Sequence, residues 1–188
     1  MKFANEQKDN VSATMNKKIA FSGDVSQVDN WLVTHRDKDG NIKDEFTFSN
    51  RIVNEGLDYA LGTALTGEVQ QTTWYIGLIS GSPTVDATDT ISEHPGWTEV
   101  TDYSEEGRQE WVSGSVADQS VNNSGSPAIF TFSEDGVEVG GAMLIADDTK
   151  GGTTGILFAA GAFEKGNKTF DIDDNIEVTA QFSNSYGA

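Results

Sequence analysis

The chain has 188 residues, of which 36% are hydrophobic, and a formal net charge of −18 from 30 acidic and 12 basic side chains. This length suits one folded domain with an appended arm, and so acidic a chain repels nucleic acid and anionic lipid. The absence of cysteine excludes disulfides and thiolate metal sites. No apolar run approaches the roughly 20 residues that cross a bilayer, and the polar N-terminus lacks a signal peptide's apolar centre, so we expect a protein made in the cytoplasm without a membrane partner.

Residues 1–25 are polar, with only isolated apolar side chains. Such a composition cannot bury enough apolar surface to fold alone and predicts a flexible N-terminal arm. The alternative is that Ile19–Val25 pairs as an edge strand or becomes ordered on a partner. We expect residues 26–188 to form a single domain.

A β-hairpin is predicted at the start of this domain. The run Val28–Arg36 indicates a strand with Trp31 and Val33 on one face, and a second strand-like run follows the turn Asp37–Asn41. Asp, Asn and Gly tolerate the positive φ that hairpin turns need. The turn faintly resembles a calcium loop, but its glycine falls too early and Phe48 stands where the closing glutamate belongs, so we favour the turn.

One helix is predicted, over Arg51–Leu65. Ser49 or Asn50 could cap its start, and Gly67 stands where a left-handed C-terminal residue belongs. An apolar stripe on one face must be buried, most simply across the open end or edge of a sheet. The stripe consists of Val53, Leu57, Ala60, Leu61, Ala64 and Leu65.

The aromatic stretch Thr72–Trp111 contains three of the four tryptophans. It begins with a buried strand at Trp74–Ile79, continues through a polar loop, and ends in two strand candidates at Trp97–Thr101 and Gln109–Val112. A strand that supports a long ordered loop with aromatic ends is typical of a contact surface.

The remainder predicts short antiparallel strands separated by turns. Ile156–Phe163 has few polar atoms on either face and should be a central strand, whereas Ile176–Phe182 alternates between apolar and polar residues and should have one wet face. Further strands are expected at Ala128–Phe132 and Val137–Ala146. The fold class is therefore mainly β: an antiparallel β-sandwich, jelly-roll or immunoglobulin-like, with one amphipathic helix, or alternatively a barrel.

No pattern specific to catalysis is present. His35 and His94 lie far apart in sequence without ligand-like spacing, and no serine elbow accompanies them. The carboxylates Glu105, Glu106 and Glu110, with Asp102, lie near tryptophans, as in a glycoside hydrolase, but such clusters arise by chance in an acidic chain. Arg108 lies among these carboxylates and should form an ion pair.

Aspartate clusters could offer oxygen ligands to calcium, although turn formation at strand ends is the simpler role. These clusters are Asp171, Asp173 and Asp174, and Asp147 with Asp148. We therefore expect no enzyme, no cofactor and no metal site. The acidity is either an adaptation for solubility or complementary to a basic partner.

Several segments together resemble a family of tailed-bacteriophage proteins encoded among virion structural genes. They are TTWYIGLI, DTISEHPGWTEVTDYSEEGRQEW, SGSPAIFTFSEDGVEVGGAMLIADDTKGGTTGILFAAGAF and the final alternating strand, together with Asn50–Asn54 before the helix. The resemblance spans roughly residues 30 to 183. It implies a virion protein, most plausibly a capsid decoration or cement protein at the capsid surface.

Such a role implies binding to the major capsid protein, often as a dimer or trimer, by covering area rather than by chemistry. Large amphipathic rings dominate contact energies, although core packing is the alternative role for each ring. The candidate anchors are Trp74, Tyr75, Trp97, Tyr103 and Trp111. Two alternatives stay open: a tail or fibre module that recognises a host glycan or receptor, and a glycan-cleaving enzyme that uses Glu105, Glu106 or Glu110.

Overall fold

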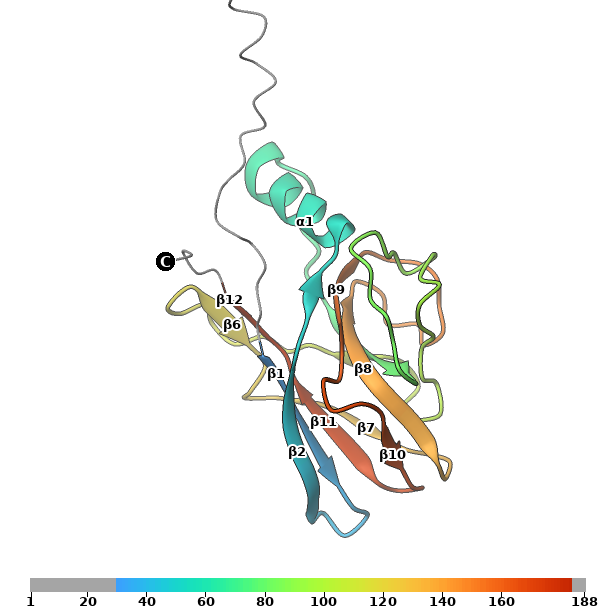
Figure 1. Ribbon diagram of the computed structural model, residues 1–188. Helices are drawn as coiled ribbons and strands as arrows, with labels where there is room; N and C mark the ends of the chain where they lie inside the picture. Colours follow the sequence, from blue (N-terminus) through green and yellow to red (C-terminus); the bar gives the residue numbers. More distant parts are fainter. Residues whose placement is uncertain (1–29, 184–188) are drawn as a thin grey trace, which may run out of the picture.

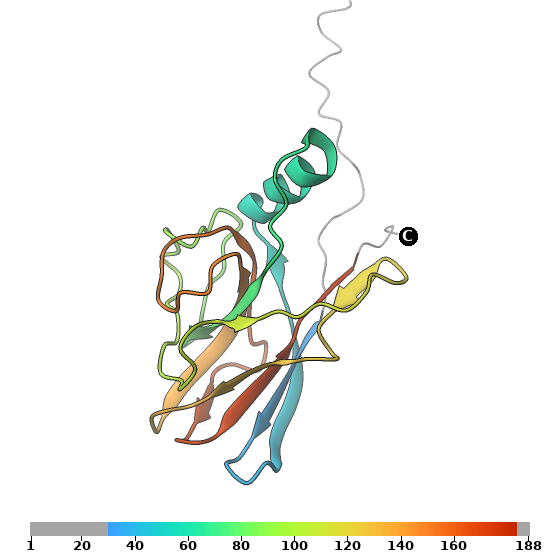
Figure 2. The same ribbon diagram turned by 180° about the vertical axis from the view of Figure 1, so that it is seen from behind.

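The computed structural model describes residues 30–183, so the predicted arm at residues 1–25 lies outside the described residues. The described chain is mainly β, with antiparallel sheets and one short helical segment (Figure 1), which confirms the predicted fold class. Two sheets pack face to face as a sandwich, and the helix lies at one end of it (Figure 2).

The first sheet contains the predicted hairpin. Gly40 adopts a φ of 85° in the turn, and the Asp37 carboxylate accepts hydrogen bonds from the backbone N–H groups of Asp39 and Asn41 at 2.9 and 2.8 Å. The strands, in spatial order, are β2 (Ile42–Ser49), β1 (Asn30–Arg36), β11 (Asn175–Thr179) and β7 (Ala128–Thr131). All neighbours are antiparallel, and the inward residues Trp31 and Val33 are completely buried, as the alternation predicts.

The second sheet carries the nearly continuous apolar strands. Its strands, in order, are β3 (Arg51–Ile52), β9 (Leu157–Ala162), β8 (Val137–Ile145), β4 (Tyr75–Ser80) and β5 (Gln109–Glu110), and β10 (Lys168–Phe170) also pairs with β8. β9 has a neighbour on both sides, which confirms the predicted central strand. A separate pair is formed by β6 (Ser120–Asn122) and β12 (Gln181–Ser183).

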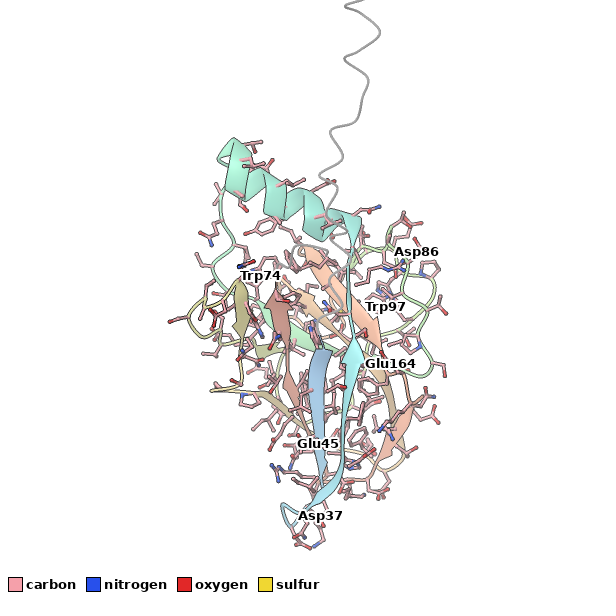
Figure 3. All side chains as sticks on the ribbon, turned by 60° about the vertical axis from the view of Figure 1, so that its left-hand side comes forward. Asp37, Glu45, Trp74, Asp86, Trp97 and Glu164 are labelled. Carbon is pink, nitrogen blue, oxygen red and sulfur yellow. The ribbon has the colours of Figure 1, made fainter. Side chains whose placement is uncertain are left out.

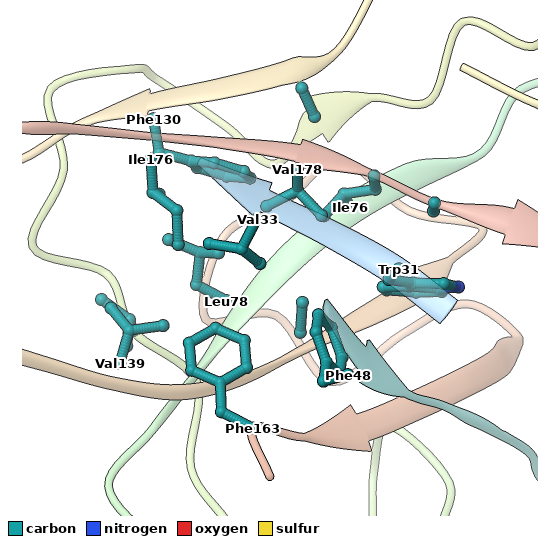
Figure 4. Packing of buried hydrophobic residues seen from close by; sticks show 14 of the residues in the cluster. Trp31, Val33, Phe48, Ile76, Leu78, Phe130, Val139, Phe163, Ile176 and Val178 are labelled. Atoms are coloured by element: carbon teal, nitrogen blue, oxygen red, sulfur yellow. The ribbon is translucent and has the colours of Figure 1, made fainter. Parts of the chain in front are cut away.

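Two cores hold the molecule together. The larger one lies between the sheets, where Val33 and Ile176 of the first sheet meet Leu78 and Val139 of the second (Figure 4). The smaller one lies on the outer face of the second sheet, beneath the loop that connects β4 to β5. Its buried members are Val53, Ile79, Ile91, Trp97, Met143, Ile145, Leu157 and Ala160.

One prediction for the loop between β4 and β5 is wrong. Trp97–Thr101 is not a strand, because its pairing with β4 is limited to one antiparallel bridge between Glu99 and Ile79. Two backbone hydrogen bonds flank this bridge, from the Ser80 N–H to the Thr98 carbonyl and from the Val100 N–H to the Leu78 carbonyl. The loop folds back over the sheet instead of projecting from it. An aromatic residue in a loop can thus belong to the core as fully as one in a strand.

The helix is shorter than predicted and begins later. Arg51 and Ile52 pair with Ala160 and Ala159 of β9, so α1 begins only at Asn54. Its N-cap is Val53, which makes no side-chain capping hydrogen bond, and the predicted caps Ser49 and Asn50 do not serve. α1 (Asn54–Leu61) continues into the π-helical turn η1 (Gly62–Thr66), and a left-handed Gly67 ends the segment, as predicted.

Candidate binding site beneath the helix

A pocket of about 470 Å³ opens between α1 and the end of the sandwich. Its floor includes Leu144 of β8 and Phe158 of β9, and Leu57 and Ala60 of α1 form one wall. The pair β6–β12 closes the other side. Figure 3 shows Trp74 beneath the helix and the hairpin residue Asp37 at the opposite end of the molecule.

Five aromatic rings line this pocket and contact one another edge to face. This aromatic cluster consists of Tyr59, Trp74, Trp111, Phe158 and Phe182. Trp74 lies 5.3 Å from both Tyr59 and Phe158, and Phe182 lies 5.5 Å from Phe158 and 5.7 Å from Trp111, measured between ring centroids. Edge-to-face pairs contribute about 0.5–1.5 kcal/mol each beyond their buried area, so the cluster is a rigid wall and not a loose collection of side chains.

Backbone pairing brings the two tryptophans together from 37 positions apart in the sequence. Trp74 directly precedes β4 and Trp111 directly follows β5, and the Trp111 N–H donates to the Trp74 carbonyl at 2.8 Å. The Trp111 indole Nε1 donates to the Ala180 carbonyl at 3.1 Å. On the helix side, the Tyr59 hydroxyl accepts from the Gln71 backbone N–H at 2.6 Å. These bonds fix the ring orientations in advance of any ligand.

Apolar side chains next to the pocket are exposed to solvent. The predicted helix stripe is buried only at Val53 and half-buried at Leu57 and Ala60, whereas Leu61 and Leu65 are 52% and 70% exposed. The helical segment extends past the end of the sheets (Figure 1), which leaves Leu61 and Leu65 exposed. We call this set the apolar rim: Leu61, Leu65, Val69 and Val116.

No charged residue among 30–183 lines the pocket, but acidic residues lie close to its lining. Asp58 on α1 and Asp118 beside Gln119 are exposed, whereas Glu110 lies directly opposite Tyr75 and shares its outer face of the sheet. The Glu68 carboxylate lies close to Gly62 at the top of the helix. The site is thus an apolar hollow in a negative surface.

The predicted anchors divide between this site and the cores. Trp74 and Trp111 both line the pocket. Tyr75 is half-buried on the outer face of the sheet, where burial raises the pKa of its phenol. Trp97 and Tyr103 are only 5% and 2% exposed, so neither ring offers contact area on the surface of this chain.

Local partners explain why those two rings point inward. The Trp97 indole Nε1 donates to Asp89 at 2.8 Å, and its ring stacks on His94 at 3.7 Å. The Tyr103 ring packs edge to face on Phe130, and burial raises the pKa of its phenol. The anchors that the sequence analysis missed are Tyr59, Phe158 and Phe182. A signal for Tyr59 exists, because it lies beside Leu57 and Ala60 on the edge of the helix stripe.

Two buried titratable side chains, Arg108 and His35, each contact a carboxylate. Arg108 is 3% exposed and donates to both Glu99 carboxylate oxygens at 2.8 Å, which confirms the predicted ion pair. His35 lies at the end of β1, buried, with its Nε2 2.8 Å from the Asp174 carboxylate. Burial alone would raise the pKa of Asp174, but hydrogen bonds from Lys43 and His35 outweigh it and hold that pKa below its ordinary value.

The acidic clusters are arranged as turns and caps. Glu105 accepts the Thr131 backbone N–H, while Glu106 and Glu110 are exposed. Asp173 adopts a φ of 66° in the turn before β11, which fits the turn role of that aspartate cluster. Within residues 30–183, no three His, Asp or Glu side chains come together so that they could bind a metal ion.

Comparison of the sequence with protein-family models and with curated proteins gives no match. Among the helices of the described residues, none has the length and apolar character needed to cross a membrane.

Proposed function

We propose that this chain is a non-enzymatic binding module that attaches to a larger assembly through the pocket and the apolar rim, and that this assembly is a bacteriophage capsid shell. The observation that carries the proposal is a preformed pocket of five rings beside apolar side chains that the chain itself leaves exposed. Contiguous exposed apolar surface marks interaction sites in soluble proteins. The resemblance of the sequence to phage virion proteins supports the shell as partner.

The energetics favour contact over chemistry. Burying a large, fully exposed apolar side chain contributes about 1.5–3 kcal/mol, and association itself costs several kcal/mol, so the exposed side chains add to the affinity but do not set it alone. Tryptophan and tyrosine dominate binding energies when they lie in well-packed pockets. Because such a module binds the assembled shell and not its separated subunits, mass action stabilises the shell.

A tail or fibre module is the second candidate. Gln70 and Gln119 lie at the pocket beside Trp74 and Trp111, and amide groups next to aromatic rings suit a glycan. The number of copies per particle separates the two candidates: hundreds indicate the shell and a handful indicate the tail. Quantitative mass spectrometry of purified virions gives that number.

The direct test is binding to expanded capsids that lack this chain, followed by sedimentation and a heat challenge. We expect the unaltered chain to co-sediment and to raise the temperature at which the shell opens. Leu65→Ser should weaken binding at least tenfold, because Leu65 is 70% exposed and its loss does not disturb the fold. The matched control is Ile172→Ser, since Ile172 is 48% exposed in the turn before β11 at the other end of the sandwich. No binding, or an equal loss in both variants, would refute the proposal.

A further inference from the structure

Within residues 30–183, Arg51 is the only basic residue next in sequence to a residue that lines the pocket. Residues 52–107 and 109–149, which supply the helix and most of the pocket, contain no lysine or arginine. Arg108 between them is buried in its pair with Glu99. Arg51 precedes the pocket residue Ile52, but successive side chains on a strand point to opposite faces, so Arg51 points away from the pocket. Hydrogen bonds from Thr88, together with the positive charge of Arg51, lower the pKa of the loop residue Asp86. An approaching ligand therefore meets negative charge around an apolar hollow.

The shape of the site suits a segment of polypeptide better than a small molecule. A volume of about 470 Å³ lies within the range of ligand pockets and has room for roughly two large apolar side chains. The apolar rim continues along the helix beyond the pocket, so a ligand that covers both must be extended. An apolar segment laid in such a groove presents its side chains at regular intervals.

The same charges argue against a second copy as occupant. In a two-fold dimer through this face, Asp58, Glu68 and Asp118 of one copy would approach the same residues of the other. Like charges placed together across an interface cost several kcal/mol. The net charge of −18 opposes such a pairing at longer range as well.

We infer that the pocket takes a short apolar segment of a partner protein that has Lys or Arg on one or both sides of two large apolar residues. This inference rests on the proposed function and specifies the part of the shell protein that the module recognises. The apolar side chains enter the aromatic cluster, and the flanking cations pair with Glu68 and Asp118. The acidity of the chain then has a role in choosing the partner, besides keeping the protein soluble.

The experiment uses three capped hexapeptides as probes: KKLFKK, its charge-reversed form EELFEE, and KKSGKK without apolar residues. Binding to the full chain is measured by calorimetry and by the fluorescence of the tryptophans, two of which line the pocket. We expect KKLFKK to bind at least tenfold more tightly than either other peptide, with an affinity that falls as NaCl increases. Equal binding of KKLFKK and EELFEE would overturn the inference.

Matched charge reversals locate the site. Glu68→Lys should weaken the binding of KKLFKK about threefold to tenfold, whereas Glu134→Lys and Glu138→Lys, at an acidic hollow beside Val137, should leave that binding unchanged. Equal effects at both places would show a general charge effect and refute the site.

A further variant tests the chain's own basic, apolar stretch Lys17–Phe21 as occupant. If Phe21→Ser binds KKLFKK and the unaltered chain does not, that stretch already fills the pocket and the partner segment is excluded. The capsid assay is independent: if the chain binds shells but shows no peptide preference, only the inferred chemistry fails. If the peptides behave as expected but shells are not bound, the decoration role fails.

Discussion

Arg108 joins two loops that are distant in sequence. Besides Glu99, its guanidinium donates to the carbonyls of Asp147 and Gly152 at 3.0 and 2.8 Å, so the β4–β5 loop is fixed to the β8–β9 loop. Removing one partner of a buried ion pair leaves the other charge uncompensated, which typically costs 3–5 kcal/mol. We expect Arg108→Met to lower the free energy of unfolding by about that amount in urea denaturation.

The control for this prediction is the double variant Arg108→Met with Glu99→Gln, which removes both charges. It should recover part of the loss, because no unpaired carboxylate remains buried. A single variant that loses less than about 1 kcal/mol would show that water reaches the pair and that the loops are fixed by other contacts.

Asp174 gives a prediction that depends on pH. Its pKa is held below the ordinary value in the folded chain, so the stability that it contributes is complete above the unfolded pKa of about 3.9 and disappears as pH falls through the folded pKa. At neutral pH, Asp174→Asn should cost about 1.5–3 kcal/mol, since the Lys43 Nζ and His35 Nε2 lose a charged acceptor at 2.7 and 2.8 Å. The difference from the unaltered chain should begin to close below about pH 4 and disappear only as pH falls through the lower, folded pKa.

Chemical denaturation at pH 7, 5 and 3.5 measures this difference. Asp171→Asn is the matched control, because Asp171 lies 3.6 Å from the same Lys43 ammonium but is 68% exposed. We expect little change in that variant at any pH. A loss for Asp174→Asn that persisted unchanged at pH 3.5 would contradict the assignment to its charge.

These residues also show what a sequence can reveal at this scale. The ion pair of Arg108 follows from a lone cation among carboxylates, but its partner Glu99 is chosen by loop packing and not by spacing. The two tryptophans Trp97 and Trp111 look alike in sequence, since both stand near acidic residues in the same stretch. Only the carboxylate of Asp89, which accepts the Trp97 indole N–H in the core, separates their roles.

At the scale of elements, the contact between α1 and β9 depends on a glycine. A Cβ atom on Gly56 would lie 2.2 Å from the Phe158 carbonyl oxygen, so Gly56→Ala must push the helix away from the sheet. Phe158 belongs to the aromatic cluster, and the pocket would therefore widen as well. We expect a loss of about 1–3 kcal/mol in thermal or urea unfolding, together with weaker binding of KKLFKK.

Gly62→Ala supplies the comparison on the same helical segment. Gly62 has helical angles (φ −58°, ψ −52°), and a Cβ atom there would meet only the flexible Glu68 carboxylate. The higher helix propensity of alanine, about 1 kcal/mol over glycine, should then leave stability unchanged or raised. Equal losses in both variants would mean that the helix is sensitive to any added atom and that contact with β9 is not the cause.

The elements were largely predictable where one local pattern decides them. Alternation indicates β1 and β11, the Asp-Gly turn indicates the hairpin, and Gly67 marks the end of the helix. The start of the helix was not predictable from the sequence, because the pairing of Arg51 with β9 is a long-range contact that overrides helical periodicity. The apolar stripe predicts a buried face, whereas the fold leaves Leu61 and Leu65 exposed, and that difference is what locates the candidate site.

At the scale of the whole molecule, the two sheets form a rigid support, and the candidate contact surface lies at one end of them. Two cores and the cross-linked loops make the sheets rigid, and one end carries the helix, the aromatic cluster and the apolar rim. Trp74 and Trp111 are the ends of segments that the sheet brings together, so a binding site built there inherits the rigidity of the strands. This organisation agrees with a module that contributes area to an assembly.

The net charge of −18 gives the last prediction, which concerns the response to salt. Exposed ion pairs such as Lys38–Asp39 contribute at most about 1 kcal/mol each and weaken in salt, whereas repulsion among the excess carboxylates acts over the whole surface. Screening shortens the reach of a charge from about 30 Å at 0.01 M to about 3 Å at 1 M salt. Relief of repulsion should therefore win, and Tm should rise by about 2–4 °C for each kcal/mol gained between 0.02 and 0.5 M NaCl. The same salt titration near pH 4, close to the ordinary pKa values of aspartate and glutamate, should give a smaller rise in Tm. A Tm that fell with salt at pH 7 would show that the ion pairs outweigh the repulsion.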